Sequence, residues 1–167
     1  GALIARSLIR QWASSNAALI GGLKRRLVRA ESLAAALADG TLPTRTELMS
    51  WITGEDAVQL GFPGLLASPE SGSQEMLVAV RRHADAVRAV LNIAIHSRAD
   101  EDRARVIRTI RDTHADRRII AFSQYADTVA ALYAALSSDG KVGALTGAGG
   151  RVAGGTITRF DALAGFA

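Results

Sequence analysis

The chain has 167 residues, of which 49% are apolar and 22% are charged, and its formal net charge is +4. This composition is typical of a soluble globular protein, and the length suits one domain, or one domain with an extension. The absence of cysteine excludes disulfides and thiolate metal sites, and no apolar run reaches the roughly 18–20 residues that span a bilayer. The opening GALIARSLIR also lacks the pattern of a signal peptide. We therefore expect a cytoplasmic protein with no membrane partner.

Positive charge is concentrated at the start of the chain. Residues 1–30 contain no acidic residue and carry +6, so the remainder carries −2. Arginine binds phosphate through two parallel hydrogen bonds, and a basic segment of this kind indicates a nucleic-acid partner. A solvated helix face is the alternative interpretation. Within this segment the candidate nucleic-acid contacts are Arg25, Arg26 and Arg29.

A long amphipathic helix is predicted over residues 16–38. Ser14 or Ser15 is its expected N-cap, and Gly40 its expected end. Apolar residues recur every three or four positions and form one stripe, namely Leu19, Leu23, Leu27, Ala30, Leu33 and Leu37.

The middle of the chain is predicted to be irregular and then helical. A short helix is expected after Pro43, and residues 54–72 contain prolines and glycines that indicate an irregular connector. Two further helices are predicted at about 73–97 and 100–113, the first with an apolar seam suited to packing on another helix.

The last third changes to an α/β pattern. The short apolar runs at 119–122 and 141–145 are predicted to be buried strands, and residues 126–138 an amphipathic helix between them. Strand, helix and strand make one βαβ unit with a right-handed crossover. The expected fold class is α/β: a mostly helical N-terminal region, 1–98, followed by a partial βαβ unit with parallel strands, 99–167.

Three constellations that often carry chemistry are weak in this sequence. The acidic triplet Asp100, Glu101 and Asp102 precedes a predicted helix, so we expect it to complement that helix's dipole and not to hold magnesium. The three histidines are not spaced as a metal-binding pair. Ser123 lacks the flanking glycines of a nucleophile elbow.

The glycine-rich stretch 147–156 raises the question of a phosphate-binding loop. Read from Gly149, it matches the pattern GxxxxGKT except that Gly155 stands in place of the lysine. Without that lysine we expect no ATP binding, whereas an exposed loop that contacts some other phosphate stays open.

Two segments in the second half resemble superfamily 2 helicases. RRIIAFSQYADTVAALYAAL resembles the fourth conserved motif of these enzymes, in which a buried strand leads to Phe-Ser-Gln-aromatic and then to a helix. VGALTGAGGRVAGGTITRFDALAGFA resembles the following segment, with a strand ending in Thr-Gly, a variable loop and a helix.

A third segment supports the same family. RQWASSNAALIGGLKRRL resembles the region that a bacterial Swi/Snf-like branch places between its two motor lobes, with Asn16 where proline is common. The resemblance therefore implies a piece of a DEAD/DEAH-type helicase, in which residues 1–98 are the inter-lobe helical region and 99–167 begin the C-terminal RecA-like lobe.

The resemblance also implies a function and a set of partners. DNA or RNA would be held by backbone contacts, and ATP and magnesium would bind only in the parent protein, whose first lobe is missing here and would be a partner. No cofactor is therefore expected in this chain. The residues whose positions match the family's nucleic-acid contacts are Ser123, Gln124, Tyr125, Thr146 and Gly147.

A second hypothesis needs no motor. The chain could be a helical protein-interaction module with a small βαβ appendage. The two predicted parallel strands are too few for a stable open sheet, and their edges can pair with another chain. We therefore expect self-association.

Overall fold

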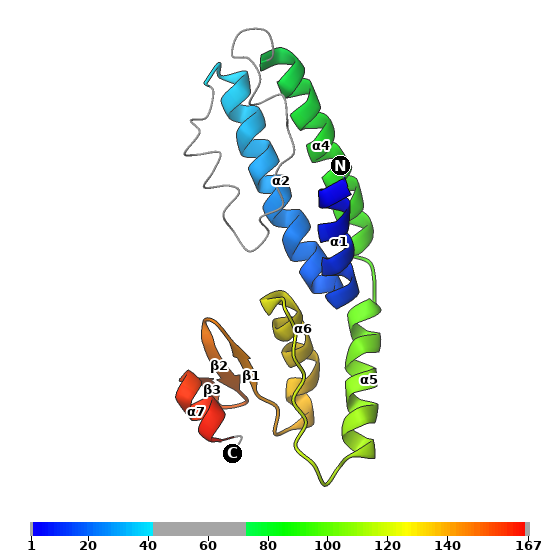
Figure 1. Ribbon diagram of the computed structural model, residues 1–167, viewed down its shortest axis with the longest axis vertical. Helices are drawn as coiled ribbons and strands as arrows, with labels where there is room; N and C mark the ends of the chain where they lie inside the picture. Colours follow the sequence, from blue (N-terminus) through cyan, green and yellow to red (C-terminus); the bar gives the residue numbers. More distant parts are fainter. Residues whose placement is uncertain (1, 42–72, 166–167) are drawn as a thin grey trace. The chain divides into compact units, whose positions relative to one another are not determined.

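The computed structural model describes residues 2–41 and 73–165, which are mostly helical and include one small sheet (Figure 1). They divide into two compact units. The described residues of the first unit are 2–11, 19–41 and 73–96, and those of the second are 12–18 and 97–165. The second unit therefore includes a short N-terminal segment that we had assigned to the helical region. The short helix expected after Pro43 and the connector 54–72 lie outside the described residues.

The first unit is built from α1 (Ala2–Ser14), α2 (Asn16–Ala38) and α4 (Ser73–Ala94). The end of α1 and the start of α2 belong to the second unit. The helices predicted at 16–38 and 73–97 are confirmed. Their apolar stripes pack on each other because both recur at the helical period. One core cluster contains Ala30, Leu33, Leu37, Leu77, Val80 and Ala84, and the other contains Leu19, Leu23, Val87 and Ala94.

The ends of α2 follow the local signals of the sequence. Ser15 is its N-cap, since its Oγ accepts the backbone N–H of Ala18 at 2.9 Å. Gly40 follows the last turn with a φ of +72°, a left-handed conformation that glycine adopts without steric cost.

Close packing explains a glycine inside α2. Gln11 of α1 is fully buried, and a Cβ atom at Gly22 would lie 2.7 Å from Gln11 Nε2 and 2.6 Å from its Cδ. Glycine lowers helix propensity by about 1 kcal/mol relative to alanine. Position 22 nevertheless favours glycine, because a larger residue would displace the buried side chain of Gln11.

We expect Gly22→Ala to destabilise the protein by about 1–3 kcal/mol, because the overpacked site must move Gln11. In the Gln11→Ala background the same change should stabilise by up to about 1 kcal/mol, through helix propensity alone. Thermal unfolding of the four proteins measures both effects. Stabilisation in both backgrounds would contradict the packing argument.

A half-buried histidine lies in the same unit as a buried arginine. Burial lowers the pKa of His83 on α4, and the positive charge of Arg26 lowers it further. The native state therefore binds this proton less readily than the unfolded chain, in which the ordinary pKa is 6.5.

The pH dependence of stability follows from the direction of this pKa shift. The contribution of His83 is fully present above pH 6.5 and is lost as the pH falls toward the lower pKa of the folded state. We expect His83→Gln to flatten the loss of unfolding free energy in this range. His96→Gln, at an exposed position of the same unit, is the control variant. Equal slopes for the wild type and His83→Gln would contradict the prediction.

The second unit holds two longer helices, a 3₁₀ turn, a small sheet and a short last helix. The helices predicted at 100–113 and 126–138 are confirmed. Besides the α1–α2 junction, this unit contains α5 (Ala99–Thr113), α6 (Ala126–Leu136), η2 (Ser137–Asp139), β1 (Ala144–Thr146), β2 (Gly149–Val152), β3 (Gly155–Ile157) and α7 (Arg159–Ala164).

The prediction of a parallel βαβ unit is wrong for the described residues. The sheet has the order β1-β2-β3 and both pairings are antiparallel, with Ala144 opposite Arg151 and Gly150 opposite Ile157. Residues 119–122 form no strand, so the described residues contain no parallel pair around α6 and give no RecA-like sheet.

The reason lies in the glycines that follow β1. Two-residue turns at 147–148 and 153–154 join neighbouring strands, and Gly149 and Gly155 adopt φ of +126° directly after them. Such turns bring partners together over a few residues, whereas a parallel pair needs a long crossover. Local pairing therefore uses the strand at 144–146, and the run at 119–122 is left without a partner in the sheet.

Candidate nucleic-acid interface

The three arginines predicted on α2 separate into two environments. Arg25 is exposed and Arg29 half-buried, whereas Arg26 is only 3% exposed and its Nη2 lies 3.5 Å from Ser7 Oγ of α1. Positions four apart share a helix face, which places Arg25 and Arg29 together. With Lys24 and Val28 they line a shallow hollow of about 300 Å³. Arg26 instead belongs to the interior of the first unit.

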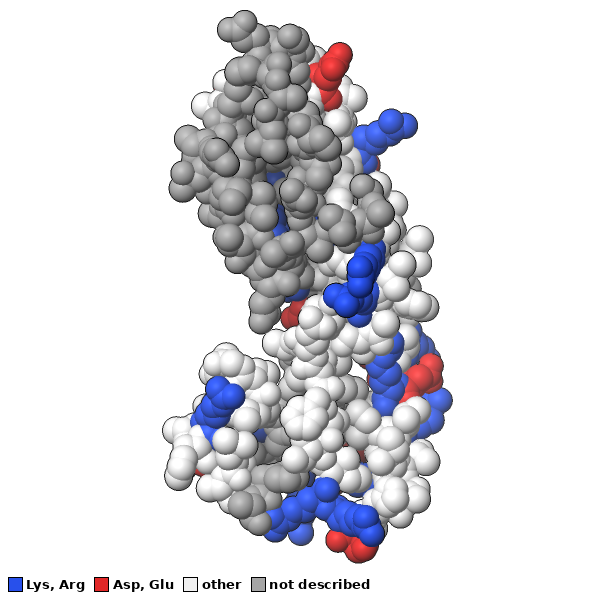
Figure 2. All heavy atoms as spheres, in the orientation of Figure 1, with Lys and Arg blue, Asp and Glu red and all other residues white. Residues whose placement is uncertain are grey.

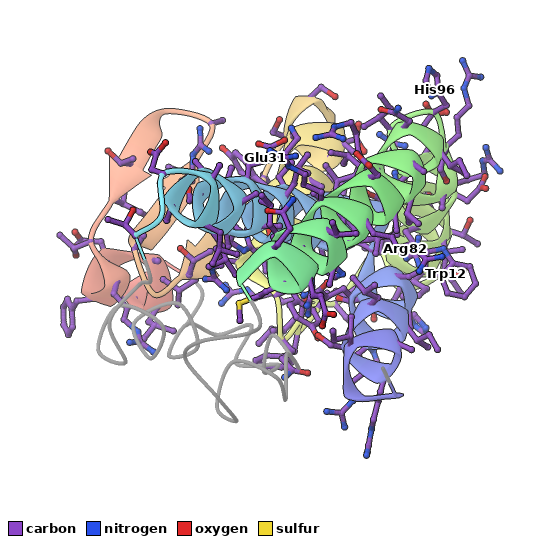
Figure 3. The ribbon with its side chains drawn as sticks, turned by 90° about the horizontal axis from the view of Figure 1, so that it is seen from above. Trp12, Glu31, Arg82 and His96 are labelled. Atoms are coloured by element: carbon purple, nitrogen blue, oxygen red, sulfur yellow. The ribbon has the colours of Figure 1, made fainter. Side chains whose placement is uncertain are left out.

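The N-terminal helix adds further exposed positive charge. Arg6 and Arg10 of α1 are exposed and lie four positions apart, and α1 contains no acidic residue. The contrast is Arg88 of α4, whose guanidinium contacts Glu31 at 2.8 Å and Asp85 at 2.6 Å. Figure 3 shows Glu31 on α2, beside α4. Lys and Arg side chains are visible on the face of the molecule drawn in Figure 2.

The segment that resembles the helicase motif contains α6 and the residues directly before it. Ser123 and Tyr125 are half-buried and Gln124 is exposed. Ser123 Oγ accepts the backbone N–H of Tyr125 at 3.2 Å, and Tyr125 is the N-cap residue of α6. Gln124 is therefore the member of this group that is best placed to reach a partner outside the chain.

A cluster of four hydroxyl groups joins this segment to the α1–α2 junction. Ser14 Oγ lies 3.2 Å from Ser123 Oγ and 2.9 Å from Thr128 Oγ1, and Ser15 Oγ lies 2.7 Å from the same Thr128 oxygen. Ser15 and Thr128 are buried. This hydroxyl cluster brings together two of the segments on which the helicase resemblance depends, although they are more than 100 residues apart in the sequence.

An ion pair on α5 binds both sides of the same junction. The Asp100 carboxylate accepts the backbone N–H groups of Asn16 and Ala17, each at 2.7 Å, at the start of α2. Arg103 donates to the carbonyls of Trp12 and Ala13 at 2.9 and 3.3 Å, at the end of α1.

The signs of these charges suit the two helix ends, since an N-terminus attracts negative charge and a C-terminus positive charge. Asp100 and Arg103 also contact each other at 3.3 Å. We call these two residues the α5 clamp. No local pattern of the sequence marks this clamp, because the Asp100 carboxylate caps a helix that begins 84 positions earlier. Of the acidic triplet, only Glu101 and Asp102 remain surface residues of the first turn, and they pair with Arg98 and Arg105 respectively.

Thr146 and Gly147 lie at the β1–β2 turn. Thr146 Oγ1 accepts the backbone N–H of Ala148 at 3.2 Å, and Gly147 is exposed. We had expected these residues at the carboxyl edge of a parallel sheet, next to Ser123. The structure places them instead in a local antiparallel hairpin.

The glycine-rich stretch is not an open phosphate loop. Residues 149–152 and 155–157 pair as antiparallel strands, so the backbone groups that face each other across this pair are used within the sheet. Among the residues that the structure describes, no group of three His, Cys, Asp or Glu side chains could hold a metal ion. No helix of the described part is long and apolar enough to cross a membrane.

No protein-family model matches this chain, and no match was found among the curated proteins or among the solved structures.

The α5 clamp predicts unequal roles for two neighbouring acids. Asp100→Ala should lower the free energy of unfolding by about 1–3 kcal/mol, because it removes two hydrogen bonds to a charged acceptor at a helix N-terminus. Asp102→Ala removes an exposed ion pair with Arg105 and should change the free energy of unfolding by less than about 1 kcal/mol. Urea unfolding compares the two. Equal effects would contradict the clamp.

Proposed function

We propose that this chain binds the backbone of DNA or RNA without reading its sequence, as part of a larger ATP-dependent helicase or translocase. The observation that carries the proposal is the basic surface of the first unit, formed by side chains of α1 and α2. Arg6 and Arg10 of α1 and Lys24 and Arg25 of α2 are exposed, and Arg29 of α2 is half-buried.

The chemistry of this surface suits a polyanion. Each guanidinium presents several N–H donors in a plane that matches phosphate oxygens. Every phosphate neutralised by such a group releases condensed counterions, so binding weakens steeply as salt rises. Contacts to phosphate and sugar position a protein on nucleic acid and do not by themselves read bases.

The motor part of the proposal rests on the sequence resemblance. It is supported by the hydroxyl cluster, through which Ser14 and Ser15 of one family-like segment contact Ser123 and Thr128 of another. In this proposal Ser123, Gln124 and Tyr125 add backbone contacts from the second unit. ATP and magnesium belong to the parent's first lobe, which would be a partner of this chain.

A protein-interaction module is the second candidate function. Large apolar side chains are exposed on α4 of the first unit, namely Val78 at 59%, Val90 at 43% and Ile93 at 75%. Exposed apolar groups of this kind favour a protein partner or a second copy of the chain. Binding through them would depend little on salt, which separates this candidate from the first.

Self-association stays a prediction for this chain. The residues 119–122 belong to no strand, and Ile120 and Phe122 are 56% and 92% exposed. An exposed apolar segment of this kind can pair with another chain.

Salt-dependent binding tests the proposed function. We expect the triple variant Lys24→Ala, Arg25→Ala, Arg29→Ala to bind duplex DNA more weakly than the wild type. Its log–log salt slope should be smaller by about 0.9 for each phosphate that the variant no longer neutralises. Fluorescence anisotropy between about 50 and 200 mM salt measures both quantities. Arg26 is left intact because its side chain is buried.

The control variant also removes three positive charges, but from residues outside the proposed surface. Arg88, Arg98 and Arg105 each contact at least one carboxylate, at 2.6–2.8, 3.8 and 2.8 Å respectively. Their replacement by alanine should reduce affinity and slope much less. If the two triple variants behave alike, only net charge matters and the proposed surface is wrong.

A further inference from the structure

Helix α4 of the first unit has apolar residues on two faces. Its buried and partly buried residues in the two core clusters include Leu77, Val80, Ala84, Val87, Leu91 and Ala94. A second series with the same spacing of three and four positions is exposed, namely Ala79, Arg82, Ala86, Ala89 and Ile93. Ala79 follows Leu77 by two positions, or about 200° around the helix, so this series lies on nearly the opposite face. We call these five residues the outer stripe of α4.

The spacing of the outer stripe indicates that another helix covers it. A helix that is apolar on all sides is normally buried, and positions that alternate three and four apart form the seam between two packed helices. Ile93 in the outer stripe is 75% exposed, and Val78 and Val90 beside it are 59% and 43% exposed. The alanines of the stripe have short side chains, so the backbone of a second helix can approach closely.

The charged member of the outer stripe identifies the chemistry of that helix. Arg82 is exposed (Figure 3), and it takes part in none of the ion pairs of the described residues. A guanidinium that a helix covers needs a carboxylate. α4 itself offers one three positions later, since the Asp85 side chain is 73% exposed and contacts Arg88 through Oδ1.

We propose that the outer stripe packs on the outer stripe of a second copy of this chain, with the two α4 helices antiparallel. Reversing the stripe maps it onto itself, with Ala79 facing Ala89 of the second copy and Arg82 facing Ala86. Arg82 then lies beside Asp85 of the second copy, and the two-fold axis repeats this contact. A parallel pair in register would instead place Arg82 beside Arg82.

This inference is independent of nucleic-acid binding. It rests on the second candidate function, for which it names the surface and the occupant. All of its residues belong to one helix of one unit.

Analytical ultracentrifugation of the full chain over a range of concentrations, without nucleic acid, tests the charge contact. Arg82→Glu and Asp85→Arg should each raise the dimer dissociation constant at least about tenfold, because each places like charges together. An equimolar mixture of the two variants should recover the dimer, since each carries the charge that the other needs. Arg81→Glu is the matched control, because Arg81 is exposed next to the stripe and the charge change is the same.

Disulfide crosslinking tests the direction of the two helices, since the chain has no cysteine of its own. Ala79→Cys mixed with Ala89→Cys should give a linked dimer under mild oxidation, and each variant alone should give much less. The double variant Ile120→Ser, Phe122→Ser should dimerise like the wild type, which separates this contact from pairing at 119–122. Recovery of the dimer in the charge mixture also shows that both charge variants are folded.

Several results would overturn the inference and leave nucleic-acid binding untouched. A wild type that stays monomeric at every concentration is one, and it would assign the outer stripe to a different protein. A dimer that both charge variants retain, or that Ile120→Ser, Phe122→Ser abolishes, places self-association elsewhere. Failure of the mixture to recover the dimer, or efficient crosslinking of Ala79→Cys alone, excludes the antiparallel contact.

Discussion

The second unit depends on the α5 clamp, in which one ion pair holds two helix ends. α1 ends at Ser14 and α2 begins at Asn16, so a single residue separates two helices. Helix ends leave backbone N–H and C=O groups without partners inside the helix. Asp100 binds two of these N–H groups, and Arg103 binds two of the carbonyls. The sharp break is stable because the same short stretch of α5 satisfies both sides of it.

The same helix repeats this device at its other end. Arg108 donates to the carbonyl of Ala135, at the end of α6, at 2.6 Å, and its Nε lies 2.7 Å from Asp139. The hydrogen bond from Arg108 lowers the pKa of Asp139, and the nearby positive charges of Arg108 and Arg111 lower it further. α5 therefore ties its neighbours through charged side chains. In the described part of the second unit the buried apolar residues are few and include Ala104 and Leu136, so polar contacts carry much of its organisation.

Local rules were sufficient for the long helices and insufficient for the sheet. The apolar period of 16–38 and 73–97 specifies both the helices and the faces that they bury, since the stripe of one helix packs on the seam of the other. A short apolar run such as 119–122 specifies a strand only where another strand pairs with it. The turns at the glycines after β1 place β2 and β3 next to it as pairing partners. The same glycines are compatible with a phosphate loop, so their presence alone does not predict these strands. The α5 clamp has no local signal at all, because its hydrogen bonds join residues 83 to 91 positions apart.

In the basic segment, the helical period decides which of the positively charged side chains are exposed and which are buried. Arg26 lies three positions after Leu23 and four before Ala30, both fully buried, so the period that forms the apolar stripe also turns Arg26 inward. Arg25 and Arg29 lie on a different face and remain accessible. The charge of +6 over residues 1–30 therefore overstates what a phosphate backbone would meet. One of the six cations is Arg26, a buried group whose charge lowers the pKa of His83, and the remaining five are the side chains that we propose as phosphate contacts.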